Sequence, residues 1–130
     1  GTGDVQLTLA QKAELTGAIV VSTPQDIALL DARKALNMFT KTKTPVLGMI
    51  ENMSTHICPK CGHESHIFGN GGAEQEAARL GLPFLGSVPL DMSIREAGDG
   101  GAPITAADPD GQYAAIFQSI AQRLIAGGLV

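Results

Sequence analysis

The chain lacks long hydrophobic runs, tryptophan, an excess of basic residues, and all but two cysteines. Of its 130 residues, 44% are hydrophobic and 4% aromatic, and the formal net charge is −4. No run reaches the roughly 18 apolar residues that a membrane span needs. The nine Lys and Arg residues are scattered, which argues against a nucleic-acid-binding face. No charged-then-apolar leader is visible. We therefore expect a cytoplasmic protein with no membrane and no nucleic-acid partner.

Short β-branched runs alternate with helical patterns along the whole chain. The runs 17–22, 45–50 and 83–88 are nearly continuous in apolar residues, which is typical of buried parallel strands. Because parallel strands need helical crossovers, the sequence predicts an α/β fold, a parallel sheet with flanking helices. The predicted helices cover 5–14, 24–40, 73–80 and 92–97, and the last begins at Asp108-Pro109.

Side-chain signals predict where these helices begin and which face they bury. Asp4 and Thr23 are N-cap candidates, Pro24 suits the first helical position, and Gly81 suits a C-terminal stop. The helical spacing of apolar residues predicts three buried faces. They consist of Ala28, Ala32, Ala35, Leu36 and Phe39; of Ala73, Ala77 and Leu80; and of Tyr113, Ile116, Phe117, Ile120, Ala121 and Leu124.

Both cysteines lie in one motif, Cys58-Pro59-Lys60-Cys61. The surrounding segment, 56–68, has no helical period, so we expect a loop or small hairpin that projects from the domain. A C-x-x-C pair directs two thiolates to one metal centre. With His63 and His66 the same segment offers four zinc ligands within nine residues, although known zinc sites usually separate two ligand pairs more widely. From spacing alone, a zinc site and an iron–sulfur site are equally compatible.

Other interpretations of the cysteines and histidines fit less well. A thioredoxin-like dithiol needs the motif at the start of a helix, whereas Gly62 follows at once and no helical pattern begins. Two surface thiols without a ligand are the remaining alternative. We expect His56, His63 and His66 to be ordinary loop residues, because imidazole ligation of iron–sulfur clusters is the exception.

Five ordered stretches resemble one known family. They are GTGDVQLTLAQ, STPQDIALLDARKAL, GMIENMS, CPKCG with HIFGNGGAE, and GSVPLDMSIREAGDGG. Together they resemble the C-terminal half of the Mrp/ApbC iron–sulfur cluster carriers, relatives of MinD among the deviant P-loop NTPases. The resemblance implies that residues 1–130 are the C-terminal part of a single NTPase domain with a metal-binding loop at 56–68.

The resemblance also implies a function and its partners. Cys58 and Cys61 of two subunits would hold one [4Fe–4S] cluster across a homodimer interface, for delivery to iron–sulfur acceptor apoproteins. ATP and Mg²⁺ would regulate this in the full-length protein, and zinc is a possible substitute metal. Two functions of other classes remain open. One is a zinc-stabilised binding module without catalysis. The other is a MinD-like partitioning ATPase, which would need a basic amphipathic membrane helix that the ending IAGGLV does not provide.

The expected nucleotide contacts come from the same resemblance. Gly3 and Asp4 would end the switch that senses the γ-phosphate, while Asn52, Pro89 and Asp91 would face the base. By its chemistry, an Asn amide can both donate to and accept from a purine edge, and Asp91 suits either an acceptor or a helix N-cap.

No phosphate-binding loop of the form G-x-x-x-x-G-K-[ST] occurs. The Gly-rich run 69–72 is not followed by lysine, so we predict that this chain alone does not hydrolyse ATP. The missing half should leave an exposed sheet edge and apolar face, through which the chain would self-associate.

Overall fold

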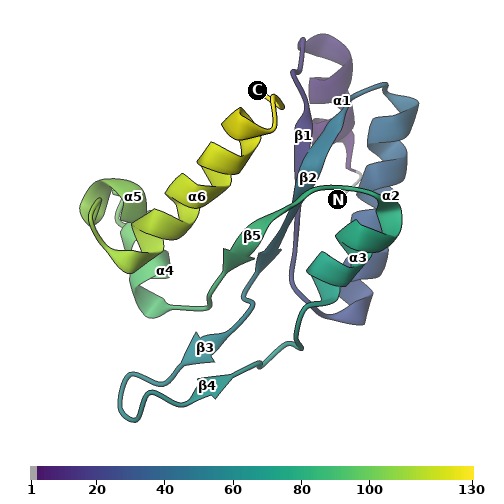
Figure 1. Ribbon diagram of the computed structural model, residues 1–130. Coiled ribbons are helices and arrows are strands. Elements are labelled where there is room, and N and C mark those ends of the chain that lie inside the picture. Colours follow the sequence, from purple (N-terminus) through teal and green to yellow (C-terminus); the bar gives the residue numbers. More distant parts are fainter. Residues whose placement is uncertain (1–2) are drawn as a thin grey trace.

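The computed structural model describes residues 3–130, which form a parallel three-stranded sheet with helices on both faces and a separate small hairpin (Figure 1). The strand order is β1-β2-β5, and both pairs are parallel. The predicted α/β class is confirmed. The elements are α1 (Asp4–Lys12), β1 (Ala18–Ser22), α2 (Asp26–Lys41), β2 (Val46–Asn52), β3 (His56–Ile57), β4 (Glu64–Ser65), α3 (Gly72–Leu80), β5 (Phe84–Val88), α4 (Met92–Asp99), α5 (Ile104–Ala107) and α6 (Gln112–Ala126).

Two apolar clusters lie on opposite faces of the sheet. One contains Val20, Met49 and Ala77 and is covered by α2 and α3, whereas the other contains Leu85 and Ile120 and is covered by α6 (Figure 1). Because β2 is central, its side chains are buried on both faces in turn. This explains why its sequence is a nearly continuous apolar run rather than an alternating one.

Two predicted helix caps are wrong. α1 begins at Asp4 itself, so Gly3 occupies the N-cap position and makes no side-chain cap bond. The carboxylate of Asp4 instead lies in the first turn, where the helix dipole favours an anion. α2 begins two residues after Pro24, with Gln25 at the N-cap. The hydroxyl of Thr23 donates to the side-chain oxygen of Gln25 at 2.8 Å instead of accepting from the helix. Gly81 does end α3, as predicted.

The buried faces of α2 and α3 differ from the predicted ones at a few positions. In α2, Leu29 and Met38 are buried in addition to Ala32 and Ala35. In α3, Leu80 is 38% exposed, whereas Glu76 is buried. Two arginines hold the Glu76 carboxylate in place, which compensates for the cost of burying it.

The last helix starts later than predicted. A one-turn helix, α5, precedes it, and α6 begins at Gln112 rather than at Asp108-Pro109. Its buried residues are Ala114 and Ile120, while Ile116, Phe117 and Leu124 pack against the core at its margin. Ala121 is exposed. Among residues 3–130, no helix is both long and apolar enough to cross a membrane.

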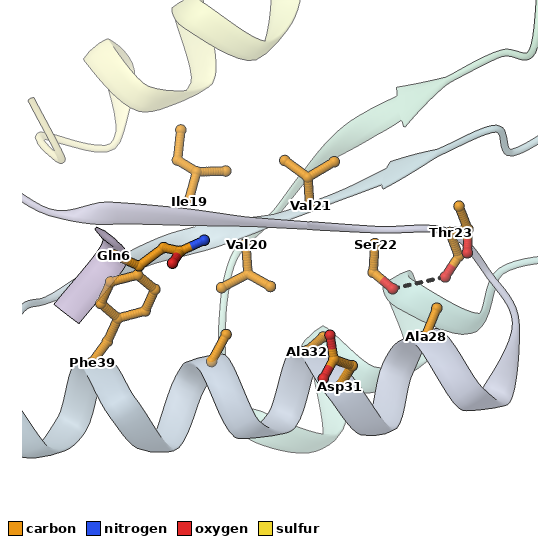
Figure 2. Close-up of a pocket in the computed structure, with 11 residues that line it drawn as sticks. Gln6, Ile19, Val20, Val21, Ser22, Thr23, Ala28, Asp31, Ala32 and Phe39 are labelled. Atoms are coloured by element: carbon orange, nitrogen blue, oxygen red, sulfur yellow. Dashed lines mark hydrogen bonds between the residues drawn. The ribbon is translucent and has the colours of Figure 1, made fainter. Parts of the chain in front are cut away.

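The two edges of the sheet are not alike. On β5, Arg123 of α6 donates to the carbonyl oxygens of Leu85 at 3.0 Å and of Phe84 at 3.5 Å. On β1, Val21 is 57% exposed. Figure 2 shows Ile19 and Val21 pointing away from α2, whereas Val20 and Ser22 point toward it. The predicted exposed edge and apolar face are therefore present at β1.

A cleft of about 380 Å³ lies between β1 and α2. Small side chains line its helical wall, namely Ala28, Ala32 and Ala35, and Phe39 lies at one end (Figure 2). The hydroxyl of Ser22 donates to the carbonyl oxygen of Thr23 at 2.8 Å and so does not reach across the cleft. The side chains of residues 3–130 thus leave this space beside β1 unfilled.

Candidate functional site: the cysteine hairpin and its root

The cysteines lie on a hairpin that projects beyond the carboxyl ends of β2 and β5 (Figure 1). β3 pairs with β4 in antiparallel fashion, with His56 opposite Ser65 and Ile57 opposite Glu64. Met53, at φ 53°, turns the chain out of β2 into this hairpin. The predicted small hairpin is confirmed, and the cysteines occupy its tip.

Local hydrogen bonds define the turn that carries the cysteines. The Cys58 N–H donates to the His63 carbonyl at 2.9 Å, and the Gly62 N–H donates to the Cys58 carbonyl at 2.9 Å. Gly62 has φ 72°, a left-handed conformation that favours glycine. The turn therefore favours glycine at position 62, directly after Cys61. Because both cysteines lie in this turn, both thiols lie at the same end of the hairpin.

The backbone stabilises a thiolate at Cys58. The pKa of Cys58 is lowered, first by the backbone N–H of Cys61, then by that of Lys60 and by the Cys61 thiol. Cys58 is half-buried and Cys61 is exposed, and neither forms a disulfide. Because the thiolate is the form that binds soft metals, this turn is suited to metal ligation.

Two of the histidines point back to the root of the hairpin rather than toward the cysteines. His56 Nδ1 lies 3.2 Å from the Leu90 carbonyl oxygen, and His66 Nδ1 lies 3.2 Å from the Ser54 carbonyl oxygen. A carbonyl oxygen only accepts, so both nitrogens carry the proton. Within residues 3–130, no three His, Cys, Asp or Glu side chains converge as a metal site. The four-ligand zinc set with His63 and His66 is therefore not assembled.

The predicted nucleotide-facing residues separate into two groups. Asn52 is paired with Val88 in the sheet, which places it beside Pro89 at the carboxyl edge. Its Oδ1 accepts from the Met53 N–H at 2.9 Å. Gly3 and Asp4 instead begin α1, whose Leu7 lies beside Lys41 and Thr42 at the far end of α2. The structure brings Asn52 and Pro89 together, while the role of Gly3 and Asp4 at the γ-phosphate stays a prediction.

Asp91 uses both of its carboxylate oxygens within the protein. Oδ1 accepts from the Ser93 N–H at 2.8 Å and so caps α4, while Oδ2 accepts from the Tyr113 hydroxyl at 2.6 Å. The Ser93 hydroxyl and then the Tyr113 hydroxyl lower the pKa of Asp91. The N-cap interpretation of Asp91 is confirmed. Sequence reasoning placed Tyr113 on an apolar face and missed its hydroxyl, although this is the one tyrosine in the chain.

Comparison with known proteins gives one consistent family. Residues 1–125 match the family model described as NUBPL iron-transfer P-loop NTPase. A protein of Pseudomonas fragi named iron–sulfur cluster carrier protein is 54% identical over 121 residues, which cover 93% of this chain and 42% of that protein. The protein of the same name from Escherichia coli K12 is 52% identical, over 97% of this chain and 34% of its own length.

Further relatives extend this to eukaryotes and to solved structures. The mouse iron–sulfur cluster transfer protein NUBPL is 50% identical over 96% of this chain and 39% of its own length. A nucleotide-binding protein from Archaeoglobus fulgidus, solved with ADP, has a TM-score of 0.70 at 36% identity, over 87% of this chain and 45% of that one. MinD of Pyrococcus furiosus has a TM-score of 0.65 at 23% identity and so shows the fold alone. The chain thus spans less than half the length of each of these relatives.

Proposed function

Because the chain belongs to the NUBPL iron-transfer P-loop NTPase family, we propose that it is the cluster-binding part of an iron–sulfur cluster carrier, with Cys58 and Cys61 as the ligands. The observation that carries this proposal is the turn at the hairpin tip. It holds two free thiols at one end of the hairpin, with Cys61 exposed and Cys58 half-buried, and it favours the thiolate at Cys58. The names of the relatives at 50–54% identity support iron–sulfur cargo over other soft metals.

The cluster itself is cargo, and we propose that it is a [4Fe–4S] cluster shared by two chains. Two thiolates supply half of a four-cysteine ligand set. A two-fold axis through the hairpin tips would supply the other half from the same residues of a second copy. Such a cluster would lie at the surface, from which it could pass to an acceptor apoprotein. A cytoplasmic location remains part of this proposal.

We propose that nucleotide binding is linked to cluster handling in the longer protein. Asn52 and Pro89 lie side by side at the carboxyl edge of the sheet, where ligands of open α/β sheets bind. Only five residues separate Asn52 from Cys58. ATP and Mg²⁺ would need a phosphate-binding loop from outside these 130 residues, and we propose that such a segment would lie beside the exposed β1 edge. For this chain by itself we expect no ATP hydrolysis. Phosphate release above a protein-free blank, abolished by changing Asn52, would refute that expectation.

Anaerobic reconstitution with iron and sulfide tests the main proposal. The wild-type chain should give the absorption and Mössbauer spectra of a [4Fe–4S] cluster, at one cluster per two chains. Cys58→Ser and Cys61→Ser should each abolish loading.

His63→Asn is the matched control, because it changes an exposed side chain of the same turn that only the zinc alternative uses. A folded wild-type chain that takes up zinc but never a cluster, with zinc lost in His63→Asn, would replace the carrier function with a zinc-stabilised module.

A further inference from the structure

Leu90 is the point at which the cysteine hairpin is tied to the domain. Its N–H donates to the Thr55 carbonyl at 2.8 Å, and its carbonyl accepts from His56 Nδ1 at 3.2 Å. The segment that immediately precedes Cys58 therefore binds both the N–H and the carbonyl of one residue. Since each strand of the hairpin has only two residues, its pairing is too short to fix its own direction. Bonds at the root hold the hairpin to the domain: those to Leu90 next to the cysteines, and those from the Ser54 N–H and hydroxyl to the Val88 carbonyl, each at 3.1 Å, where the chain leaves β2.

Leu90 in turn depends on its neighbour Asp91. The other neighbour, Pro89, has no N–H to donate. Asp91 is held at Oδ1 by Ser93, within α4, and at Oδ2 by the Tyr113 hydroxyl at 2.6 Å, from α6. α4 has no fully buried residue and packs on the core through the partly buried Ile94, so the polar contact at its N-cap adds to a small apolar attachment. A line of contacts thus runs from α6 through Asp91 and Leu90 to the hairpin.

We propose that Tyr113 and His56 are positioning residues that fix the direction of the cysteine hairpin through Leu90. The proposal rests on the proposed function of the hairpin as the cluster-binding element. Neither residue binds the cluster. Tyr113 holds the loop after β5 from the α6 side, and His56 fastens the hairpin to that loop. Two hairpins that share one cluster must meet in a narrow range of orientations, because ligand geometry tolerates only about 0.5 Å of error.

The chemistry of the two residues allows matched substitutions. Tyr113→Phe removes a hydroxyl that donates to an ionised carboxylate and leaves the ring in place. His56→Ala removes the donor to Leu90, whereas His56→Asn keeps an amide N–H at the position of Nδ1. Ser119→Ala is the control, since it deletes an exposed hydroxyl from the same helix as Tyr113.

The experiment loads each variant of the 130-residue chain with iron and sulfide and follows loss of the cluster to an iron chelator by absorbance. Tyr113→Phe and His56→Ala should each lose the cluster about three- to tenfold faster than wild type, as expected for one hydrogen bond to a charged or backbone group. His56→Asn and Ser119→Ala should stay within about twofold of wild type on the same scale. The double variant Tyr113→Phe/His56→Ala should be no faster than the faster single variant, because both act through Leu90.

Amide hydrogen exchange of the metal-free chain supplies a readout that general destabilisation would not mimic. In Tyr113→Phe, the Leu90 amide should exchange about three- to tenfold faster, while the amide of Met49 in the core strand should not change. Equal acceleration at both amides would mean a merely structural role and would overturn the proposal.

Two further results would also overturn it. One is a double variant whose rate of cluster loss rises by the product of the two single effects. The other is a His56→Asn chain that loses the cluster as fast as His56→Ala. A wild-type chain that never loads a cluster refutes the proposed function, and the positioning role with it. A wild-type chain that loads, beside variants that retain the cluster equally well, refutes the positioning role alone. Because Tyr113→Phe is a conservative change, its cluster-loss rate and its amide exchange still decide the proposal if His56→Ala fails to fold.

Discussion

A buried carboxylate joins α2 to α3, and its removal is the sharpest test of what holds the helical layer together. The side chain of Glu76 is 6% exposed and lies between two arginines. It accepts from Arg33 Nη2 at 2.9 Å and from Arg79 Nη2 at 2.6 Å, with a further bond from the Nε of each arginine. Hydrogen bonds from Arg33 first, and then from Arg79, lower the pKa of Glu76 from 4.5 to about 2, against the opposing effect of burial.

The lowered pKa sets the size and direction of the expected effect. One pKa unit corresponds to about 1.4 kcal/mol, so the whole shift has a ceiling of roughly 3 kcal/mol. The side chains of Arg33 and Arg79 are 42% and 57% exposed, and solvent screening lowers the expected contribution to about 2 kcal/mol. A folded-state pKa below the unfolded one gives stability that is fully present above the unfolded value. This contribution is lost as the pH falls from about 4.5 toward 2.

Urea unfolding followed by far-UV circular dichroism measures this directly. At pH 7, Glu76→Gln should lower the free energy of unfolding by about 2 kcal/mol. The difference between wild type and Glu76→Gln should shrink steadily between pH 5 and pH 3, because the wild type loses its advantage as Glu76 becomes protonated. Glu74→Gln on the same helix is the control, since Glu74 is exposed and should leave the curve unchanged.

A constant difference between wild type and Glu76→Gln from pH 6 to pH 3 would refute the reasoning. It would mean that the ionised state of Glu76 does not stabilise the fold, and that the substitution acts through a cause that is independent of charge.

Three other predictions concern separate parts of the molecule. Gly48→Ala should lower the free energy of unfolding by about 2–4 kcal/mol in the same urea assay. The reason is that Gly48 has φ 158° and that an added Cβ would lie 2.7 Å from the Pro83 carbonyl oxygen. A loss below roughly 1 kcal/mol, the size of an ordinary surface change, would contradict this. The metal-free Cys58 thiol should react with iodoacetamide at a lower pH than an ordinary thiol, because backbone N–H groups lower its pKa. If the alkylation rate rose with a midpoint at or above about pH 8.5 both in wild type and in Cys61→Ser, this would count against the prediction. The isolated chain should self-associate through the β1 edge, where Val21 is exposed. Light scattering that gives only monomer mass at high concentration would argue against this, and Val21→Lys should shift any assembly toward monomer.

The strands and the class of fold could be predicted because their signal is local. The central strand β2 is covered on both faces and is apolar at most positions, and the edge strands β1 and β5 are also mostly apolar, so all three are visible as short runs. The cysteine hairpin was predictable for a related reason, since a segment rich in Cys and His without helical period cannot pack as a helix. Helix starts were less accurate. The side chain that precedes a helix has a choice of partners, as Thr23 shows by bonding to Gln25.

The contacts that position the site could not be predicted, because their partners are far apart in the sequence. Asp91 and Tyr113 are 22 residues apart, and His56 and Leu90 are 34 apart. The burial of Glu76 depends on Arg33, 43 residues away. Composition and periodicity describe one element at a time. Whether Tyr113 packs as an apolar residue or donates a hydrogen bond depends on Asp91 at the start of α4, which the pattern of α6 alone does not include.

The turn at the hairpin tip makes its defining bonds within itself. The bonds from Cys58 to His63 and from Gly62 to Cys58 involve no residue of the sheet or its helices, and a Cβ at Gly62 would meet open space. In the proposed carrier, the chemistry of the two thiols and their orientation are therefore separable properties. The first would travel with a transplanted stretch from Ile57 to Glu64 into any antiparallel hairpin of matching register. The orientation depends on Leu90, which is not part of that stretch, so a recipient scaffold would gain the two thiols without the contacts that orient them.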